Sequence, residues 1–348
     1  VFVSSLAVVF FLSLGIVALY AETGKIRASL AKQKGADLLN RGEVKEAVFE
    51  FERAAQIEPK NFRNHNLLVQ ARTEQVRRLI QQASEGENVQ QEFQTVVSLA
   101  IQDSQKSIEL YPNEPNSWRI QGSFYELIIP FIQGSERFAF DAYKKAAERD
   151  PLNPSVYVDL GRAGLVFADR LQVGAEQASA EERKQLSELY SQILGESSQA
   201  FTKAVDVKGD FSQAHFLLAQ TALRQGDAKQ AIRSAENAKL ASPFDIGTAF
   251  QLGLLYYQNN DFDRAREEFQ RAVSIDSNYS NARYFLGLIY DRQGDREKAI
   301  EEFEKVETFN PGNDEIKNIL SNLRGGGNAL EGIAPLPEER SRVPVGDR

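Results

Sequence analysis

Between residues 212 and 313, small, large apolar and polar residues follow one pattern that recurs about every 34 residues. Three copies in phase occupy 212–245, 246–279 and 280–313. A fixed period of this size indicates a solenoid built from stacked units. The eighth places hold Ala219, Gly253 and Gly287, the twentieth places Ala231, Ala265 and Ala299, and the twenty-fourth places Ala235, Phe269 and Phe303.

The pattern predicts two antiparallel helices in each unit. Small residues such as Gly253 and Ala265 let the two helices approach closely, and Phe269 fills the space beside them. Gly226 and Gly294 suit the left-handed conformation that ends a first helix. Proline ends most of the copies because it cannot continue a helix.

These features are similar to those of the tetratricopeptide repeat, and weaker copies extend the resemblance over most of Gly35 to Asn313. The resemblance implies an all-α fold, a superhelical solenoid of antiparallel helix pairs; a generic amphipathic helix bundle is the alternative. The predicted parts are a transmembrane helix (1–20), a juxtamembrane basic segment (21–34), repeat 1 (35–61), an extended repeat-like helix pair (62–114), a repeat with an insertion (115–153), an extended repeat (154–211), three regular repeats (212–245, 246–279, 280–313), a capping helix (314–324) and a disordered tail (325–348).

The irregular copies carry local signals of their own. Pro130 predicts the end of, or a kink in, the first helix of its repeat, and Gly134 predicts the turn. Ser179 and Glu182 have the spacing of a capping box, which predicts a second long helix reaching Val207.

Residues Val1–Tyr20 carry no charge. A helix of this length spans about 30 Å, the thickness of the hydrocarbon core of a bilayer, and therefore predicts a membrane span. A buried globular helix and a cleaved signal peptide are the alternatives. The basic residues Lys25, Arg27, Lys32 and Lys34 follow, which places the array on the cytoplasmic side of a bacterial inner membrane. Because the sequence does not begin with methionine, we expect a fragment or a processed product.

Composition excludes several functions. The chain has 348 residues, a net charge of -8 and a sequence pI of about 5.2, which argues against nucleic-acid binding. It has no cysteine, so disulfides and thiolate metal sites are excluded. Its two histidines, His65 and His215, are far apart, and no metalloprotease, nucleophile-elbow or phosphate-loop motif occurs. We therefore expect no cofactor and no catalytic residue in this chain.

The concave face of such a solenoid is the candidate binding surface. Places two, five, nine, twelve and thirteen of each first helix are expected to line it and to hold an extended or helical peptide from a protein partner. The alternative is that the aromatic residues at the fifth place pack between neighbouring repeats. The predicted groove residues are Gln213, Phe216, Gln220, Arg224, Phe250, Leu254, Tyr257, Tyr284, Leu288 and Arg292, with Leu223, Gln258, Asn281 and Asp291 beside them.

A narrower resemblance carries a second hypothesis. The stretches FYELIIPFIQGSERFAFDAYKKA, FQLGLLYYQNNDFDRA and NARYFLGLIYDRQGDREKAIEEFEKV resemble the C-terminal repeat region of bacterial O-antigen-ligase-like membrane proteins. That resemblance implies an accessory module of a polytopic glycan ligase or polymerase whose catalytic part lies upstream of Val1. The first hypothesis is a membrane-anchored scaffold that binds protein or peptide partners and is not catalytic. The sequence upstream of Val1 would distinguish the two.

Overall fold

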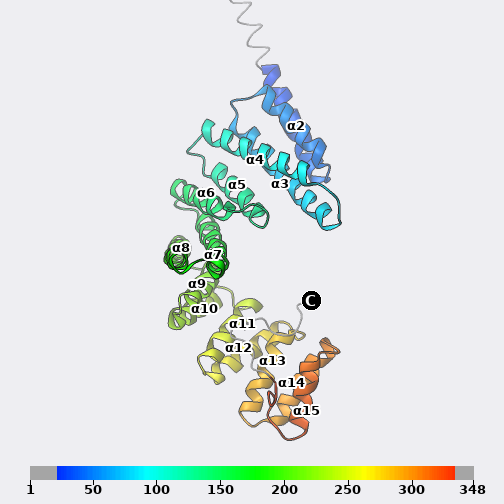
Figure 1. Cartoon of the computed structure of the whole chain (residues 1–348), viewed down its shortest axis with the longest axis vertical. Helices are drawn as coiled ribbons and strands as arrows, with labels where there is room; N and C mark the ends of the chain where they lie inside the picture. Colours follow the sequence, from blue (N-terminus) through cyan, green and yellow to red (C-terminus); the bar gives the residue numbers. More distant parts are fainter. Residues whose placement is uncertain (1–21, 334–348) are drawn as a thin grey trace, which may run out of the picture. The chain divides into compact units, whose positions relative to one another are not determined.

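The computed structural model describes residues 22–333, which are helical and contain no strand (Figure 1). They fall into two compact units, one ending at Ile193 and the other beginning at Leu194, and each is described by itself. The predicted membrane span Val1–Tyr20 and the tail residues 334–348 lie outside the described residues. Within residues 22–333, no helix combines the length and the apolar character needed to cross a membrane.

The first unit begins with a helix over residues 22–40. Ala28 and Ala31 in this helix are buried, so the first repeat starts well before Gly35. Within the predicted juxtamembrane basic segment 21–34, the described residues 22–34 belong to this helix. The helices that follow are α2 (Val44–Ile57), α3 (Phe62–Ser84), α4 (Gln90–Leu110), α5 (Pro115–Ile128), α6 (Ser135–Arg149), α7 (Pro154–Gln177) and the first half of α8 (Ala180–Val207).

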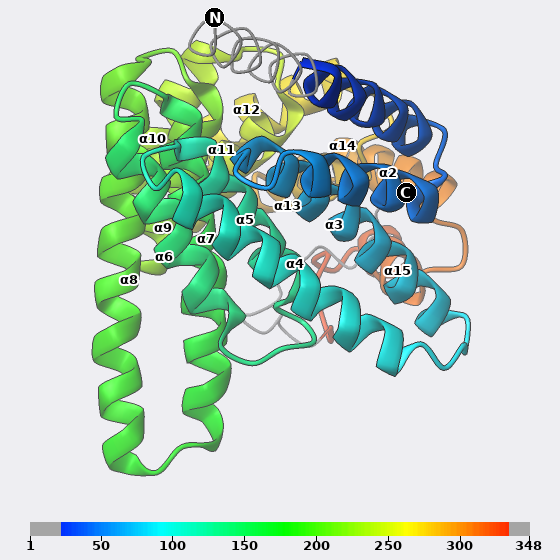
Figure 2. The ribbon, with the colours of Figure 1, turned by 90° about the horizontal axis from the view of Figure 1, so that it is seen from above.

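The chain reverses its direction at Pro130 and Gly134 and again at Ser179, the places that the sequence of the irregular copies marked. Helix α5 ends at Ile128, two residues before Pro130, and Gly134 starts α6 with a φ of 86°. At the start of α8 the Glu182 amide donates to Ser179 Oγ at 3.4 Å, and Glu182 Oε2 accepts from the Ser179 amide at 3.0 Å. This reciprocal pair is the predicted capping box. It starts α8 (Figure 2), and there Arg183 Nε donates to the Ala175 carbonyl of α7 at 3.1 Å.

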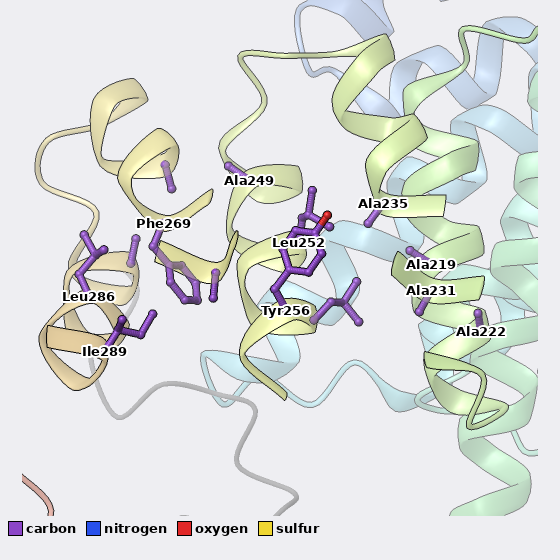
Figure 3. Close-up of a cluster of buried hydrophobic side chains, with 14 residues drawn as sticks. Ala219, Ala222, Ala231, Ala235, Ala249, Leu252, Tyr256, Phe269, Leu286 and Ile289 are labelled. Atoms are coloured by element: carbon purple, nitrogen blue, oxygen red, sulfur yellow. The ribbon is translucent and has the colours of Figure 1, made fainter. Parts of the chain in front are cut away.

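The second unit contains the regular repeats. It consists of the second half of α8, then α9 (Ser212–Arg224), α10 (Ala228–Ala241), α11 (Ile246–Gln258), α12 (Phe262–Ile275), α13 (Ser280–Arg292), α14 (Arg296–Phe309) and α15 (Asp314–Arg324). The predicted packing residues of the first two regular repeats lie in one core cluster across α9 to α13 (Figure 3), and Ala299 and Phe303 of the third lie in the next cluster. In the first cluster the α9–α10 pair contributes alanines, whereas α11 and α12 contribute Leu252, Tyr256 and Phe269.

In four helix pairs, a glycine on one helix faces an aromatic ring on the other helix. A Cβ added to any of these glycines would lie only 2.5 to 2.9 Å from a ring carbon of its partner, closer than any real contact. The absence of a side chain is therefore what lets the ring lie against the backbone. The pairs are Gly35 with Phe51, Gly122 with Tyr143, Gly253 with Phe269, and Gly287 with Phe303.

The turn that ends each first helix has two functions. Gly226, Asn260 and Gly294 take positive φ angles of 78°, 59° and 81°, which reverses the chain. The aspartate that follows is the N-cap of the second helix: Asp227 and its equivalents accept a hydrogen bond from an amide three residues ahead. The recurrent Gly-Asp or Asn-Asp pair thus ends one helix and begins the next.

The residues after α15 are packed, contrary to the expectation of disorder from residue 325 onward. Ala329 is fully buried and belongs to the cluster formed by α13, α14 and α15. Its amide donates to Asp291 Oδ2 at 2.8 Å, and Arg296 Nη2 donates to the Gly326 carbonyl at 2.8 Å. Residues 325–333 are therefore part of the folded unit, because these bonds and the burial of Ala329 hold them on the last repeat.

Candidate partner-binding groove

The second unit has a hollow of about 720 Å³ between α9 and α11, the first helices of two consecutive repeats. Places five, nine, twelve and thirteen of α9 face places two, five, six, nine, ten and thirteen of α11 across it. We call this hollow the α9–α11 groove. Its lining is Phe216, Gln220, Leu223, Arg224, Gly247, Phe250, Gln251, Leu254, Leu255 and Gln258.

The structure brings some of the predicted residues together in this groove. Phe216, Gln220, Arg224, Phe250 and Leu254 all line it. They belong to two helices but recur at the same places of the repeat, because a superhelix of identical helix pairs presents equivalent places on one face. Leu223 and Gln258, named beside them from the sequence, also line the groove.

Three further predicted residues lie on exposed or half-buried surface outside the groove lining. Gln213 is exposed. The half-buried Tyr257 lies edge-to-face against Phe262, with ring centroids 5.4 Å apart, and burial raises the pKa of its hydroxyl. The Arg292 guanidinium carbon lies 4.2 Å from the centre of the Phe262 ring, a cation–π contact.

Tyr284 and Leu288 are buried, so they do not form a surface for a partner. The Tyr284 side chain is 0% exposed, and its hydroxyl donates to Glu315 Oε1 of α15 at 2.8 Å. Its ring lies edge-to-face on Phe303 at 5.6 Å. These two side chains pack between helices, as the alternative predicted, because α15 and the residues after it cover the last repeat.

Phe250 both packs between repeats and lines the groove. Its half-buried ring lies within 5.4 to 6.0 Å of the rings of Phe269, Tyr279 and Phe285, and it also lines the groove. The packing contacts fix the orientation of the ring, so the floor of the groove is preformed. A preformed apolar floor loses little conformational freedom when a ligand binds.

A polar group that the sequence reasoning missed lies in the same wall. Gln251 Oε1 is buried and has no hydrogen-bond partner. Gln251 occupies the sixth place of its repeat, which shows no periodic signal. A buried acceptor without a partner lowers stability unless a donor reaches it. A peptide bound in the groove could supply this donor, because one of its backbone amides could donate to Gln251 Oε1.

The groove differs in charge from the rest of the chain. Its lining contains one cation, Arg224, and no carboxylate, although the whole chain has a net charge of -8. Apolar side chains and the amides of Gln220, Gln251 and Gln258 make up much of the rest. The arrangement suits an extended segment with apolar side chains and neutral or acidic neighbours.

The histidines have structural partners. His215 Nε2 lies 2.9 Å from the Gly209 carbonyl, and His65 Nδ1 lies 2.9 Å from Asp103 Oδ1. Burial lowers the pKa of His65. Across residues 22–333, no three side chains among histidine, aspartate and glutamate are grouped to hold a metal ion.

Comparison with known proteins agrees with the repeat pattern. The tetratricopeptide-repeat family model matches residues 187–245 and 250–314. No curated protein matches the sequence. Among solved structures, the C-terminal part of a TPR repeat-containing protein from Cytophaga hutchinsonii is similar over 82% of this chain and 97% of its own, with 12% identity and a TM-score of 0.56.

Two other solved structures have a weaker likeness. A tetratricopeptide repeat protein from Parabacteroides merdae shares 17% identity over 86% of this chain and 99% of its own, with a TM-score of 0.48. YrrB, described as a TPR protein with an unusual peptide-binding site, shares 20% identity over 60% of this chain and 93% of its own, with a TM-score of 0.44. None of these matches is an O-antigen-ligase-like protein, so that resemblance stays a prediction. Helix pairs, repeat period and family match together identify this chain as one that contains tetratricopeptide repeats.

Proposed function

We propose that this chain is a tetratricopeptide-repeat scaffold that binds a protein or peptide partner in the α9–α11 groove and has no catalytic activity of its own. The observation that carries the proposal is the groove itself: a preformed aromatic and aliphatic floor with one buried amide oxygen, Gln251 Oε1, that lacks a partner. Apolar pockets with a few polar groups are typical binding sites. The ligand class that fits is an extended peptide with an apolar anchor.

The test uses two exposed leucines of the second unit. Leu223 is 37% exposed and lines the groove, whereas Leu240 on α10 is 77% exposed and does not line it. Peptides selected by display against the chain are measured for affinity against the Leu223→Asp and Leu240→Asp variants. Burying a leucine contributes about 1.5–3 kcal/mol, so Leu223→Asp should weaken Kd about tenfold or more. Leu240→Asp should leave Kd unchanged.

Both variants place a charge on an exposed position, so their circular dichroism spectra should match that of the parent chain. Equal loss of affinity in both variants, or no loss in either, would show that the selected peptides bind elsewhere.

The membrane part of the proposal is supported by sequence alone. The twenty uncharged residues Val1–Tyr20 favour an anchor in the bacterial inner membrane, with the repeats on the cytoplasmic side. The Val9→Arg variant should be lost from the membrane fraction, because a charge at the centre of a span strongly opposes insertion. The glycan-ligase alternative rests on the narrower resemblance, and the coding sequence upstream of Val1 tests it.

A further inference from the structure

The residues after α15 follow the same face of the repeats that forms the groove. Ala329 is fully buried in the cluster that holds Leu288, and its amide donates to Asp291 Oδ2 at 2.8 Å. Leu288 and Asp291 are the ninth and twelfth places of their repeat. In the two preceding repeats, three of the four equivalent residues, Gln220, Leu254 and Leu223, line the groove, and the fourth, Tyr257, lies outside its lining. The chain therefore covers, on α13, the places that in most cases line the open groove on α9 and α11.

The segment is fixed up to the last described residue. Asn322 Nδ2 donates to the carbonyls of Ala329 and Glu331 at 3.2 and 2.7 Å. The Ile333 amide donates to the Leu330 carbonyl at 3.2 Å, and the Ile333 side chain packs against the same cluster. The tail, residues 334–348, thus continues from an anchored point beside the last repeat. It begins Ala-Pro-Leu-Pro-Glu-Glu.

We propose that residues Pro335–Glu339 of this tail dock in the α9–α11 groove, with Leu336 on its apolar floor, and so exclude other peptides from it. The inference uses the groove of the proposed function but assigns it an occupant from the same chain.

The length of the tail permits this docking. An extended chain advances about 3.3–3.6 Å per residue. Leu336 is three residues beyond Ile333, so it can lie up to about 10 Å from that anchored residue, and Glu338 and Glu339 can lie up to about 7–11 Å further. The Phe285 ring of α13 lies 6.0 Å from the Phe250 ring on the groove floor, so the floor of the groove lies next to the last repeat.

The chemistry of the segment matches the lining. Pro335 and Pro337 favour an extended backbone and lack amide donors, so the Leu336, Glu338 and Glu339 amides are the available N–H groups. Gln251 Oε1, buried without a partner, can accept one of them. The two glutamates approach the wall that carries Arg224, the one cation of a lining without carboxylates.

Because the tail is covalently attached to the last repeat, even a weak affinity is enough for it to occupy the groove. A short tether gives an effective concentration on the order of 1 mM. A segment whose separate Kd is about 100 μM would then fill the groove for most of the time. A competing peptide would bind about tenfold more weakly than to an open groove.

The test measures a fluorescein-labelled peptide of residues 334–342 by fluorescence anisotropy against the full chain and its Leu336→Asp variant. Leu336→Asp should open the groove and tighten the apparent Kd of the peptide about tenfold. Val345→Asp, the same type of substitution beyond the docking residues, should leave Kd at the parent value. Adding Leu223→Asp to Leu336→Asp should abolish binding of the peptide.

Three results would overturn the inference. Equal affinity for the parent and Leu336→Asp would mean that the tail does not occupy the groove. Binding that survives Leu223→Asp would place the peptide elsewhere. Dimers in sedimentation velocity that Leu336→Asp converts to monomers would mean that the tail occupies a second copy. Peptides selected by display report on the groove separately, so the proposed function can hold even where the tail does not dock.

Discussion

The contact between Gly253 and Phe269 gives the sharpest test of how the repeats are packed. A Cβ at position 253 would lie 2.6 Å from Phe269 Cε1, whereas carbon atoms in contact prefer about 3.5–4.0 Å. Phe269 is 0% exposed, so its ring has no free space to move into. We therefore expect Gly253→Ala to separate α11 from α12 or to force the ring out of its preferred rotamer.

The magnitude follows from two opposing effects. Overpacking a filled core lowers stability by about 1–3 kcal/mol. Replacing glycine by alanine inside a helix raises stability by about 0.8–1 kcal/mol. Gly195 in α8 provides the control, because a Cβ there meets no atom within 4 Å. Gly195→Ala should therefore stabilise the chain by the helix effect alone, and the two alanine variants should differ by about 1–3 kcal/mol.

Urea unfolding followed by circular dichroism measures both variants, and amide hydrogen exchange in α11 and α12 localises the effect. The second measurement matters because repeat arrays need not unfold in one step.

A second substitution separates overpacking from other causes. Phe269→Ala alone should destabilise the chain by about 3–5 kcal/mol, since it leaves a cavity. In that background the ring is gone, so Gly253→Ala should become stabilising by about 1 kcal/mol. The repeat at 212–245 already has this combination, Ala219 opposite Ala235. If Gly253→Ala has the same sign with and without the ring, the reasoning is refuted.

Two further predictions concern the regular repeats. Ala231→Leu should lower the free energy of unfolding by about 1–3 kcal/mol, measured by urea unfolding, because Ala231 is fully buried between α9 and α10. The Lys298 and Arg264 side chains hold the pKa values of Asp295 and Asp261 below the ordinary value. A carboxyl with a lowered folded pKa contributes stability above about pH 3.9 and loses it as the pH falls through the folded pKa. The double variant Asp261→Asn/Asp295→Asn should therefore lose less of its urea-unfolding midpoint than the parent between pH 5 and about pH 2.5, and an equal loss would contradict this.

The repeat period predicted the helix pairs well, because each helix depends on contacts inside its own repeat. The extended helix pair expected over 62–114 is observed as α3 (Phe62–Ser84) and α4 (Gln90–Leu110), and the capping helix expected over 314–324 as Asp314–Arg324. Small residues opposite rings, turns and caps are all local. They therefore appear directly in the order of residues.

The ends of the array were harder to predict, because their packing depends on what covers them. Tyr284 and Phe250 share the fifth place, yet Tyr284 is buried by α15 and Phe250 lines a groove. Residues 325–333 are rich in glycine, which indicated disorder, but the burial of Ala329 and bonds such as those to Asp291 and Arg296 hold them. Gln251 was missed because one unpartnered oxygen has no sequence signature.

The α9–α10 pair has alanines where its neighbours have a glycine and a ring. Methyl groups make far fewer dispersion contacts than a phenyl ring, so at these places this pair is held by fewer side-chain contacts than its neighbours. Under mechanical load along the array, opening should begin there. A ligand that spans α9 and α11 would tie this repeat to the next one, so occupancy of the groove would also raise the force needed to separate the two repeats.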